Sequence, residues 1–134
     1  MENRISCNHI GIFTNNPYRL IDFYRKNFGF RREKEEILAK EITQKIFGVN
    51  ARCIFVKLKS ADVVIEIFAP VKKKLKHSFG LTGFNHIGIG VKEREKFIKR
   101  LRRNGAKIIS VKRNSHKVYF LMDPDMNLIE IREG

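Results

Sequence analysis

The pentapeptide Asn-His-Ile-Gly-Ile at Asn8–Ile12 recurs unchanged at Asn85–Ile89, 77 residues further along the chain. Each copy precedes a stretch with the apolar periodicity of an amphipathic helix. Each of these stretches ends near a glycine, Gly29 in the first half and Gly105 in the second. Because glycine commonly ends helices in a left-handed conformation, both halves predict the same strand-and-helix opening. The chain is therefore predicted to be a tandem repeat of one module.

Both halves also close alike, on the tripeptide Ile-Glu-Ile at residues 65–67 and 129–131. The expected order in each module is a strand, a helix and then further strands. Strands are expected at residues 5–13, 31–38, 52–59, 63–68, 84–91, 107–112, 117–122 and 128–132, with a short helix or lid at 40–47. Module one is expected at about residues 5–70 and module two at about 83–134, joined by a charged linker at 71–82 within one domain.

Each repeated strand carries one histidine or one glutamate on the face opposite its isoleucines, because strand side chains alternate between faces. If the isoleucine faces pack under helices, the other faces would line a shared cavity with two imidazoles and two carboxylates. Such a set suits a divalent transition metal, and Zn, Ni, Co, Mn and Fe(II) are all compatible with it. The predicted ligands are His9, Glu66, His86 and Glu130.

The composition of the chain limits its partners. Among 134 residues, 28 Lys and Arg stand against 14 Asp and Glu, a formal net charge of +14, which favours an anionic partner. No nucleic-acid motif accompanies the basic residues, so a nucleic acid is not expected. Apolar runs are too short to cross a bilayer and the start of the chain lacks an apolar signal region. Two cysteines without Cys-x-x-Cys spacing predict no disulfide scaffold, so we expect a soluble cytoplasmic protein.

Beyond the two pentapeptides, the segments Phe23–Phe30, Val118–Asp125 and Asn127–Ile131 carry a family resemblance. The sequence resembles the glyoxalase/bleomycin-resistance/extradiol-dioxygenase group, the vicinal oxygen chelate superfamily. The resemblance implies an α+β fold of two paired βαβββ modules that form a curved mixed sheet around a metal-binding cavity. It also implies a homodimer, and in some members two subunits supply the ligands of one site. Family turns commonly have glycine where this chain has Met126.

The four candidate ligands match, by position, the four-ligand pattern of members similar to glyoxalase I and methylmalonyl-CoA epimerase. The resemblance thus implies a divalent-metal-dependent lyase or isomerase of the lactoylglutathione lyase type. Such an enzyme removes a proton next to a carbonyl through a metal-stabilised enediolate, with Glu130 as the expected base and Glu66 as the second choice. Glutathione-using relatives tend to carry Arg and Asn where this chain has Phe13 and Pro70. Another thiol or CoA conjugate is therefore the expected anionic substrate.

Three residues are predicted to contact the substrate. Cys7 and Phe13 share a strand face with His9, and Arg52 could bind a phosphate or carboxylate. Two alternatives stay open, an epimerase-like enzyme and a non-catalytic ligand-binding protein of the same superfamily. The four ligands could come from one chain or from two subunits of a dimer.

Overall fold

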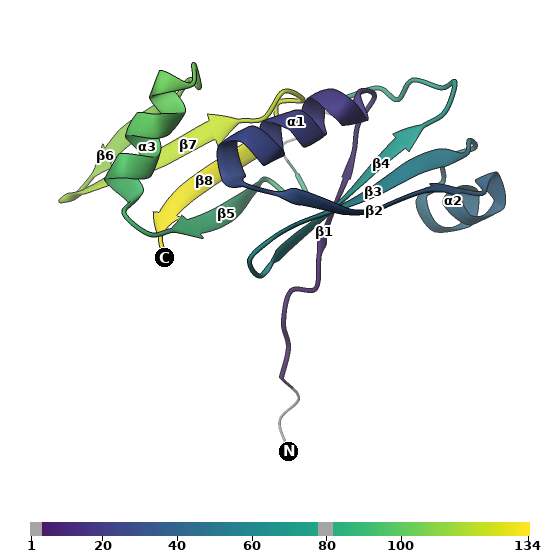
Figure 1. The fold of residues 1–134 in the computed structure, drawn as a ribbon, viewed down its shortest axis with the longest axis horizontal. Helices are drawn as coiled ribbons and strands as arrows, with labels where there is room; N and C mark the ends of the chain where they lie inside the picture. Colours follow the sequence, from purple (N-terminus) through teal and green to yellow (C-terminus); the bar gives the residue numbers. More distant parts are fainter. Residues whose placement is uncertain (1–3, 78–81) are drawn as a thin grey trace. The chain divides into compact units, whose positions relative to one another are not determined.

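A computed structural model of the chain describes residues 4–77 and 82–134. The chain divides into two compact units, Met1–His77 and Ser78–Gly134, and the division falls within the expected linker at 71–82. The described part of each unit contains, in chain order, a strand, a helix and three further strands, and that of the first unit has an additional short helix (Figure 1). The predicted α+β fold of two βαβββ modules is confirmed.

The first unit has a four-stranded mixed sheet in the order β1-β4-β3-β2. β1 runs parallel to β4, and the other neighbours are antiparallel. β2 and α2 have the predicted bounds. β3 and β4 begin and end within two residues of the predicted positions, and β1 ends at the predicted residue. The elements are β1 (Ile10–Phe13), α1 (Pro17–Phe28), β2 (Arg31–Leu38), α2 (Lys40–Phe47), β3 (Cys53–Ser60) and β4 (Val63–Pro70).

The helix α1 forms where the sequence signals its two ends. The Asn16 side chain accepts a hydrogen bond from the backbone N–H of Arg19 at its start, followed by Pro17 in the first turn, where a proline loses no helical hydrogen bond. Gly29 ends the helix with φ +69°. Leu20 and Tyr24 are fully buried between α1 and the isoleucine face of β4. This face forms the core, and it leaves the opposite face of the sheet to carry His9 and Glu66.

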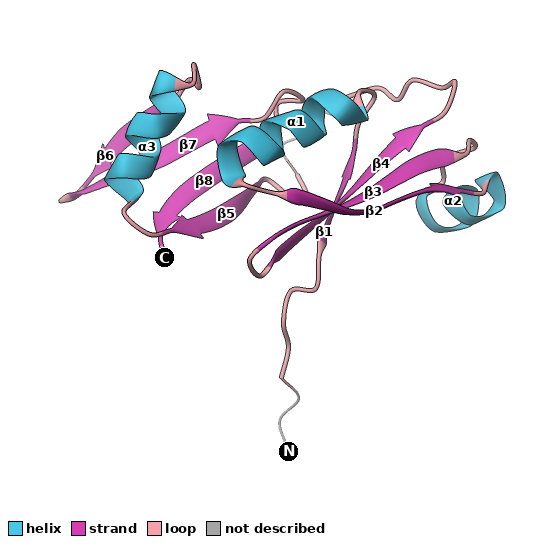
Figure 2. Ribbon diagram, viewed as in Figure 1, coloured by secondary structure: helices cyan, strands magenta, loops and turns pink. Residues whose placement is uncertain are grey.

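The second unit repeats this architecture with the sheet order β5-β8-β7-β6, in which β5 runs parallel to β8. Ile98 and Leu101 of α3 are buried, as are Ile129 and Ile131 of β8, so this core also lies under a helix (Figure 2). No helix within residues 4–77 and 82–134 is long and apolar enough to span a membrane. The elements are β5 (His86–Val91), α3 (Arg94–Arg103), β6 (Ile109–Arg113), β7 (His116–Met122) and β8 (Leu128–Glu133).

The first strand of each unit starts later than the sequence predicted. β1 begins at Ile10 rather than at residue 5, and β5 begins at His86 rather than at 84. Each of these strands is hydrogen-bonded to one parallel neighbour, and β8 itself begins at Leu128, in register with His86. Residues 84 and 85 therefore have no strand beside them. In the first unit β4 begins at Val63, two residues before the partner of Ile10, so residues 5–7 lie beyond the start of β4. Ile5 is accordingly 95% exposed, despite its β propensity.

Candidate metal centre

The first His–Glu pair lies where β1 begins beside β4. The parallel register aligns Gly11 with Glu66, and His9, two residues earlier, lies on the same face. Its Nε2 is 3.3 Å from Oε1 of Glu66. A Cβ on Gly11 would contact only the Phe68 ring, at 3.5 Å, so the space beside Glu66 is open. The side chains of His9 and Glu66 are 44% and 21% exposed, and a ligand can reach both.

The second unit reproduces this pair at the start of β5. Gly88 aligns with Glu130, and Nε2 of His86 is 3.3 Å from Oε2 of Glu130. The other carboxylate oxygen, Oε1, accepts a hydrogen bond of 3.3 Å from the guanidinium of Arg132. The Glu130 side chain is 15% exposed, and it is thus more enclosed than Glu66. The internal repeat of sequence is therefore a repeat of side-chain geometry as well.

The asparagine before each histidine fixes the orientation of the imidazole. Nδ1 of His9 is 2.8 Å from Oδ1 of Asn8, and Nδ1 of His86 is 2.8 Å from Oδ1 of Asn85. Because an amide oxygen only accepts, Nδ1 must donate, and the neutral ring then presents the Nε2 lone pair. That lone pair faces a carboxylate oxygen. Two acceptors that face each other are stabilised by a cation between them. A divalent metal suits this nitrogen and oxygen donor set, and a proton bound to Nε2 would also satisfy it.

The structure brings the four predicted ligands together as two pairs, His9 with Glu66 and His86 with Glu130. Over residues 4–77 and 82–134, no three His, Cys, Asp or Glu side chains gather within one metal-binding cluster. Each unit therefore offers two ligands, one nitrogen and one oxygen. A site with all four ligands stays a prediction.

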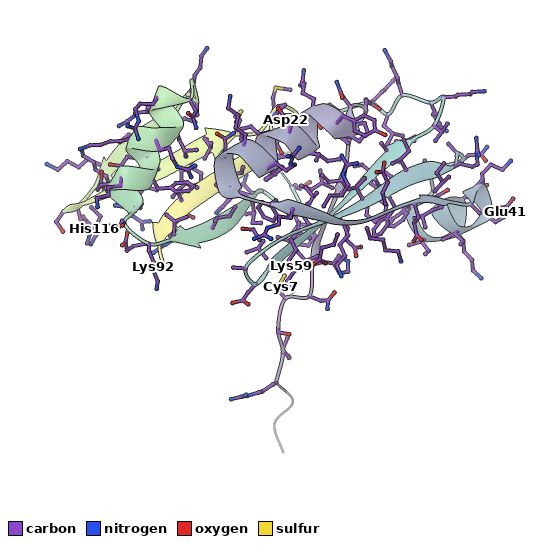
Figure 3. All side chains as sticks on the ribbon, viewed as in Figure 1. Cys7, Asp22, Glu41, Lys59, Lys92 and His116 are labelled. Atoms are coloured by element: carbon purple, nitrogen blue, oxygen red, sulfur yellow. The ribbon has the colours of Figure 1, made fainter. Side chains whose placement is uncertain are left out.

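The three predicted substrate residues lie in different settings. Phe13 stacks on Phe68 with ring centroids 5.3 Å apart and meets the edge of Phe47 at 5.1 Å, so an aromatic wall continues from the His9 face. Cys7 is exposed on the segment before β1, and its thiol donates to the backbone oxygen of His9 at 3.7 Å (Figure 3). Arg52 is exposed just before β3. Their roles in substrate binding stay predictions.

Sequence reasoning missed two residues that lie directly opposite the glutamates. The tight hairpin that pairs Ser60 with Val63 aligns Lys57 with Glu66. In the second unit the register between β7 and β8 aligns Phe120 with Glu130, and the Phe120 ring lies 5.3 Å from the His86 ring, edge to face. Counting back from each turn would have found both residues. Across the strand pair, Glu66 is thus aligned with Lys57 and Glu130 with Phe120, while Arg132 on the same strand donates a hydrogen bond to Glu130.

Burial raises the pKa values of two other side chains, Cys53 and Tyr119. Burial raises the pKa of the Cys53 thiol, which is fully buried, so a thiolate nucleophile is disfavoured there. Burial, and then a hydrogen bond of 2.8 Å to the Glu95 carboxylate, raises the pKa of Tyr119. The Arg94 guanidinium lies 4.8 Å from the centroid of the same ring. Both groups serve the packing of their units.

Solved structures of similar fold come from several organisms. A glyoxalase family protein from Enterococcus faecalis is 23% identical, with a TM-score of 0.73, over 96% of this chain and 97% of that one. The trypanothione-dependent glyoxalase I of Leishmania major is 20% identical, with a TM-score of 0.70, over 97% and 87%. A mutant of the fosfomycin resistance protein FosX from Listeria monocytogenes, complexed with Mn(II) and 1S,2S-dihydroxypropylphosphonic acid, is 14% identical, with a TM-score of 0.68, over 96% and 92%.

At these identities the solved structures establish the fold. No curated protein sequence matches the chain. The sequence profile of the Glyoxalase/Bleomycin resistance protein/Dioxygenase superfamily matches residues 6–131, nearly the whole chain and both repeats. The chain therefore belongs to the Glyoxalase/Bleomycin resistance protein/Dioxygenase superfamily.

Proposed function

We propose that His9, Glu66, His86 and Glu130 together hold one divalent metal ion, and that the protein is a lyase or isomerase of glyoxalase type. The reaction is the removal of a proton next to a carbonyl in a small anionic substrate. The observation that carries this proposal is the duplicated geometry of the two His–Glu pairs, in which each Nε2 lone pair faces a carboxylate oxygen at 3.3 Å. Two nitrogen and two oxygen ligands leave positions for substrate on a six-coordinate ion.

The metal, when bound, would polarise the carbonyl oxygen and stabilise the negative charge that develops on it. The two histidines supply neutral nitrogen ligands whose tautomer the adjacent asparagines fix. The two carboxylates balance the charge of a divalent ion. One of them must also accept the substrate proton, a contribution typically worth about 10²–10⁴-fold in rate.

Glu130 is the proposed proton acceptor, and its surroundings support the choice. Phe120 lies opposite Glu130 in the sheet, whereas Lys57 lies opposite Glu66. Glu130 is also the less exposed of the two glutamates.

Solvent deuterium exchange at the substrate α-carbon tests this proposal. The protein, loaded in turn with each candidate metal, is incubated in D₂O with methylglyoxal–thiol adducts, with methylmalonyl-CoA and with a short phosphorylated carbonyl compound, and exchange is followed by NMR. Wild type is expected to exchange at least one of them. Glu130→Gln is expected to lose exchange by about 10²-fold or more while keeping its metal. Glu66→Gln, the matched change in the other pair, is expected to retain part of the exchange.

Two results would contradict the proposal. Unchanged exchange in Glu130→Gln would remove Glu130 from the role of base. Metal binding by wild type without exchange on any of the three substrates would favour a non-catalytic ligand-binding protein.

A homodimer is the proposed assembly, and mixing two inactive variants tests how its sites are built. His9→Ala and His86→Ala each lack one ligand of one pair. If a site combines the first unit of one chain with the second unit of its partner, a heterodimer of these variants contains one intact site and regains activity. If both pairs of a site come from one chain, the mixture stays inactive.

A further inference from the structure

Three lysines lie on the face of the first sheet that carries His9 and Glu66. Lys57 of β3 is directly opposite Glu66, and Lys34 of β2 is directly opposite Lys57. Lys59, two residues along β3, shares the face with Lys57 because strand side chains alternate, and it is aligned with Val64 of β4. Lys59 lies near the end of β3, close to the hairpin turn that leads into β4 (labelled in Figure 3). We call Lys34, Lys57 and Lys59 the lysine cluster.

The second unit shows that this fold does not require basic residues at these positions. Phe120 is opposite Glu130, as Lys57 is opposite Glu66, and Ile109 is opposite Phe120, as Lys34 is opposite Lys57. The position that matches Lys59 is Met122, which is aligned with Leu128. The same register next to the same kind of His–Glu pair thus carries apolar side chains in one unit and ammonium groups in the other.

Repulsion between the ammonium groups of the lysine cluster destabilises the first sheet. Lys34 and Lys57 are like charges directly across a strand pair, an arrangement that destabilises a sheet. Each of the two lysines has an acidic partner, with Lys57 Nζ 3.6 Å from Glu33 and Lys34 Nζ 3.5 Å from Glu36, but exposed ion pairs of this kind contribute little. Protection of an open sheet edge could account for Lys34 on the edge strand β2. It does not account for Lys57 and Lys59 on the inner strand β3.

We propose that the lysine cluster binds a phosphate or phosphonate group of the substrate. Neighbouring strands lie about 5 Å apart, so the ammonium groups of Lys57 and Lys59 can approach an oxyanion held beside Glu66. The oxyanion and the reacting carbonyl must then be only a few bonds apart. This geometry selects a small phosphorylated or phosphonylated carbonyl compound over a CoA thioester, whose phosphates lie beyond the long pantetheine arm. The claim that the bound oxyanion belongs to the substrate rests on the proposed function. The claim that the lysine cluster binds an oxyanion rests only on the structure of the first unit.

Titration of inorganic phosphate into the metal-free full-length chain tests the cluster, with binding followed by isothermal calorimetry. The test variant is Lys57→Gln/Lys59→Gln. The control, Lys72→Gln/Lys74→Gln, removes the same charge from exposed linker residues. Loss of two charge-assisted contacts is expected to weaken phosphate binding about 10-fold or more in the test variant, and less than about 2-fold in the control. Lys57→Arg/Lys59→Arg is expected to restore it.

Equal losses in the two glutamine variants, or an unchanged affinity in the Lys57/Lys59 variant, would overturn the oxyanion subsite. Circular dichroism establishes that each variant is folded. Metal binding is measured on the same samples, and it separates the two proposals. Absence of metal binding in wild type, together with a selective loss of phosphate binding in the Lys57/Lys59 variant, would reject the proposed function and leave the oxyanion subsite standing. Stronger binding of coenzyme A than of a short phosphorylated carbonyl compound would overturn the small-substrate assignment.

Discussion

The two units build the same His–Glu pair on sheets of the same topology, yet they surround it differently. Around His9 and Glu66 lie the lysine cluster and, further along the strands, an aromatic wall to which α2 contributes Phe47. Around His86 and Glu130 the matching positions are apolar, and residues 82–134 contain no counterpart of α2. The pair geometry depends on strand register, a glycine and an asparagine. The side chains around each pair occupy positions that the pair geometry does not constrain. Differences in substrate preference are expected to arise at these positions.

The units also differ in the turn that leads into the strand carrying the glutamate. In the first unit a two-residue turn, Ala61 and Asp62, joins β3 to β4. In the second unit the longer turn is built around the buried carboxylate of Asp123. Its oxygens accept hydrogen bonds from the backbone of Asp125 and from the backbone and side chain of Asn127, at 2.8 to 3.0 Å.

The largest expected effect comes from removing that carboxylate. Asp123→Ala leaves three donors without their acceptor in a part-buried turn, and it is expected to lower the free energy of unfolding by about 2–4 kcal/mol. Asp62→Ala, at an exposed position in the first unit's turn, is expected to change it by less than about 0.5 kcal/mol. Urea unfolding followed by circular dichroism measures both. Similar effects of the two substitutions would contradict this account of the turns.

Most of this architecture could be predicted from the sequence because it follows from periodicity. The repeated pentapeptide located the two histidines and the repeated Ile-Glu-Ile the two glutamates. Alternation placed the isoleucines of β4 and β8 in the cores, where Ile65, Ile67 and Ile129 are fully buried. The early starts predicted for β1 and β5 were wrong because β propensity does not reveal whether a partner strand is present. Lys57 and Phe120 were missed because cross-strand neighbours depend on turn length rather than on either strand alone.

Replacement of the asparagines next to the histidines is expected to weaken metal binding. Asn8→Ala and Asn85→Ala each remove the acceptor of an Nδ1–H, and each is expected to lower metal affinity about 10- to 100-fold. In the metal-free protein, ¹⁵N NMR of the imidazoles is expected to show a mixture of tautomers instead of the Nδ1–H form. Asn→Asp keeps an acceptor and is the control. An unchanged tautomer in the alanine variants would remove this role from the asparagines.

The helix starts in the two units offer a smaller contrast. Asn16 caps α1 with its amide oxygen, whereas α3 relies on Glu133 from β8, which accepts from the backbone N–H groups of Glu93 and Arg94 at 3.2 and 2.9 Å. Asn16→Ala and Glu133→Gln are each expected to cost about 1 kcal/mol of unfolding free energy. The cost of Glu133→Gln is expected to shrink in high salt because it is partly electrostatic. An equal salt dependence in both variants would contradict the contrast.

The smallest expected effect concerns residues forced into the left-handed region of backbone conformation. Met126 has φ +67° and Ala61 has φ +48°, one in each of the two turns. Replacing either by glycine removes steric strain but adds freedom to the unfolded chain. Met126→Gly and Ala61→Gly are each expected to raise the free energy of unfolding by up to about 1 kcal/mol, as measured by thermal unfolding. A loss of stability in either would show that the side chain contributes more than its strain costs.

Metal stoichiometry shows whether the two His–Glu pairs share one metal ion. Elemental analysis and calorimetric titration are carried out on wild type, His9→Ala and His86→Ala. Wild type is expected to bind one ion tightly per chain, and each variant is expected to show a large loss of metal affinity. Two ions per chain in wild type, with one retained in each variant, would contradict a shared ion and show that each unit binds metal independently.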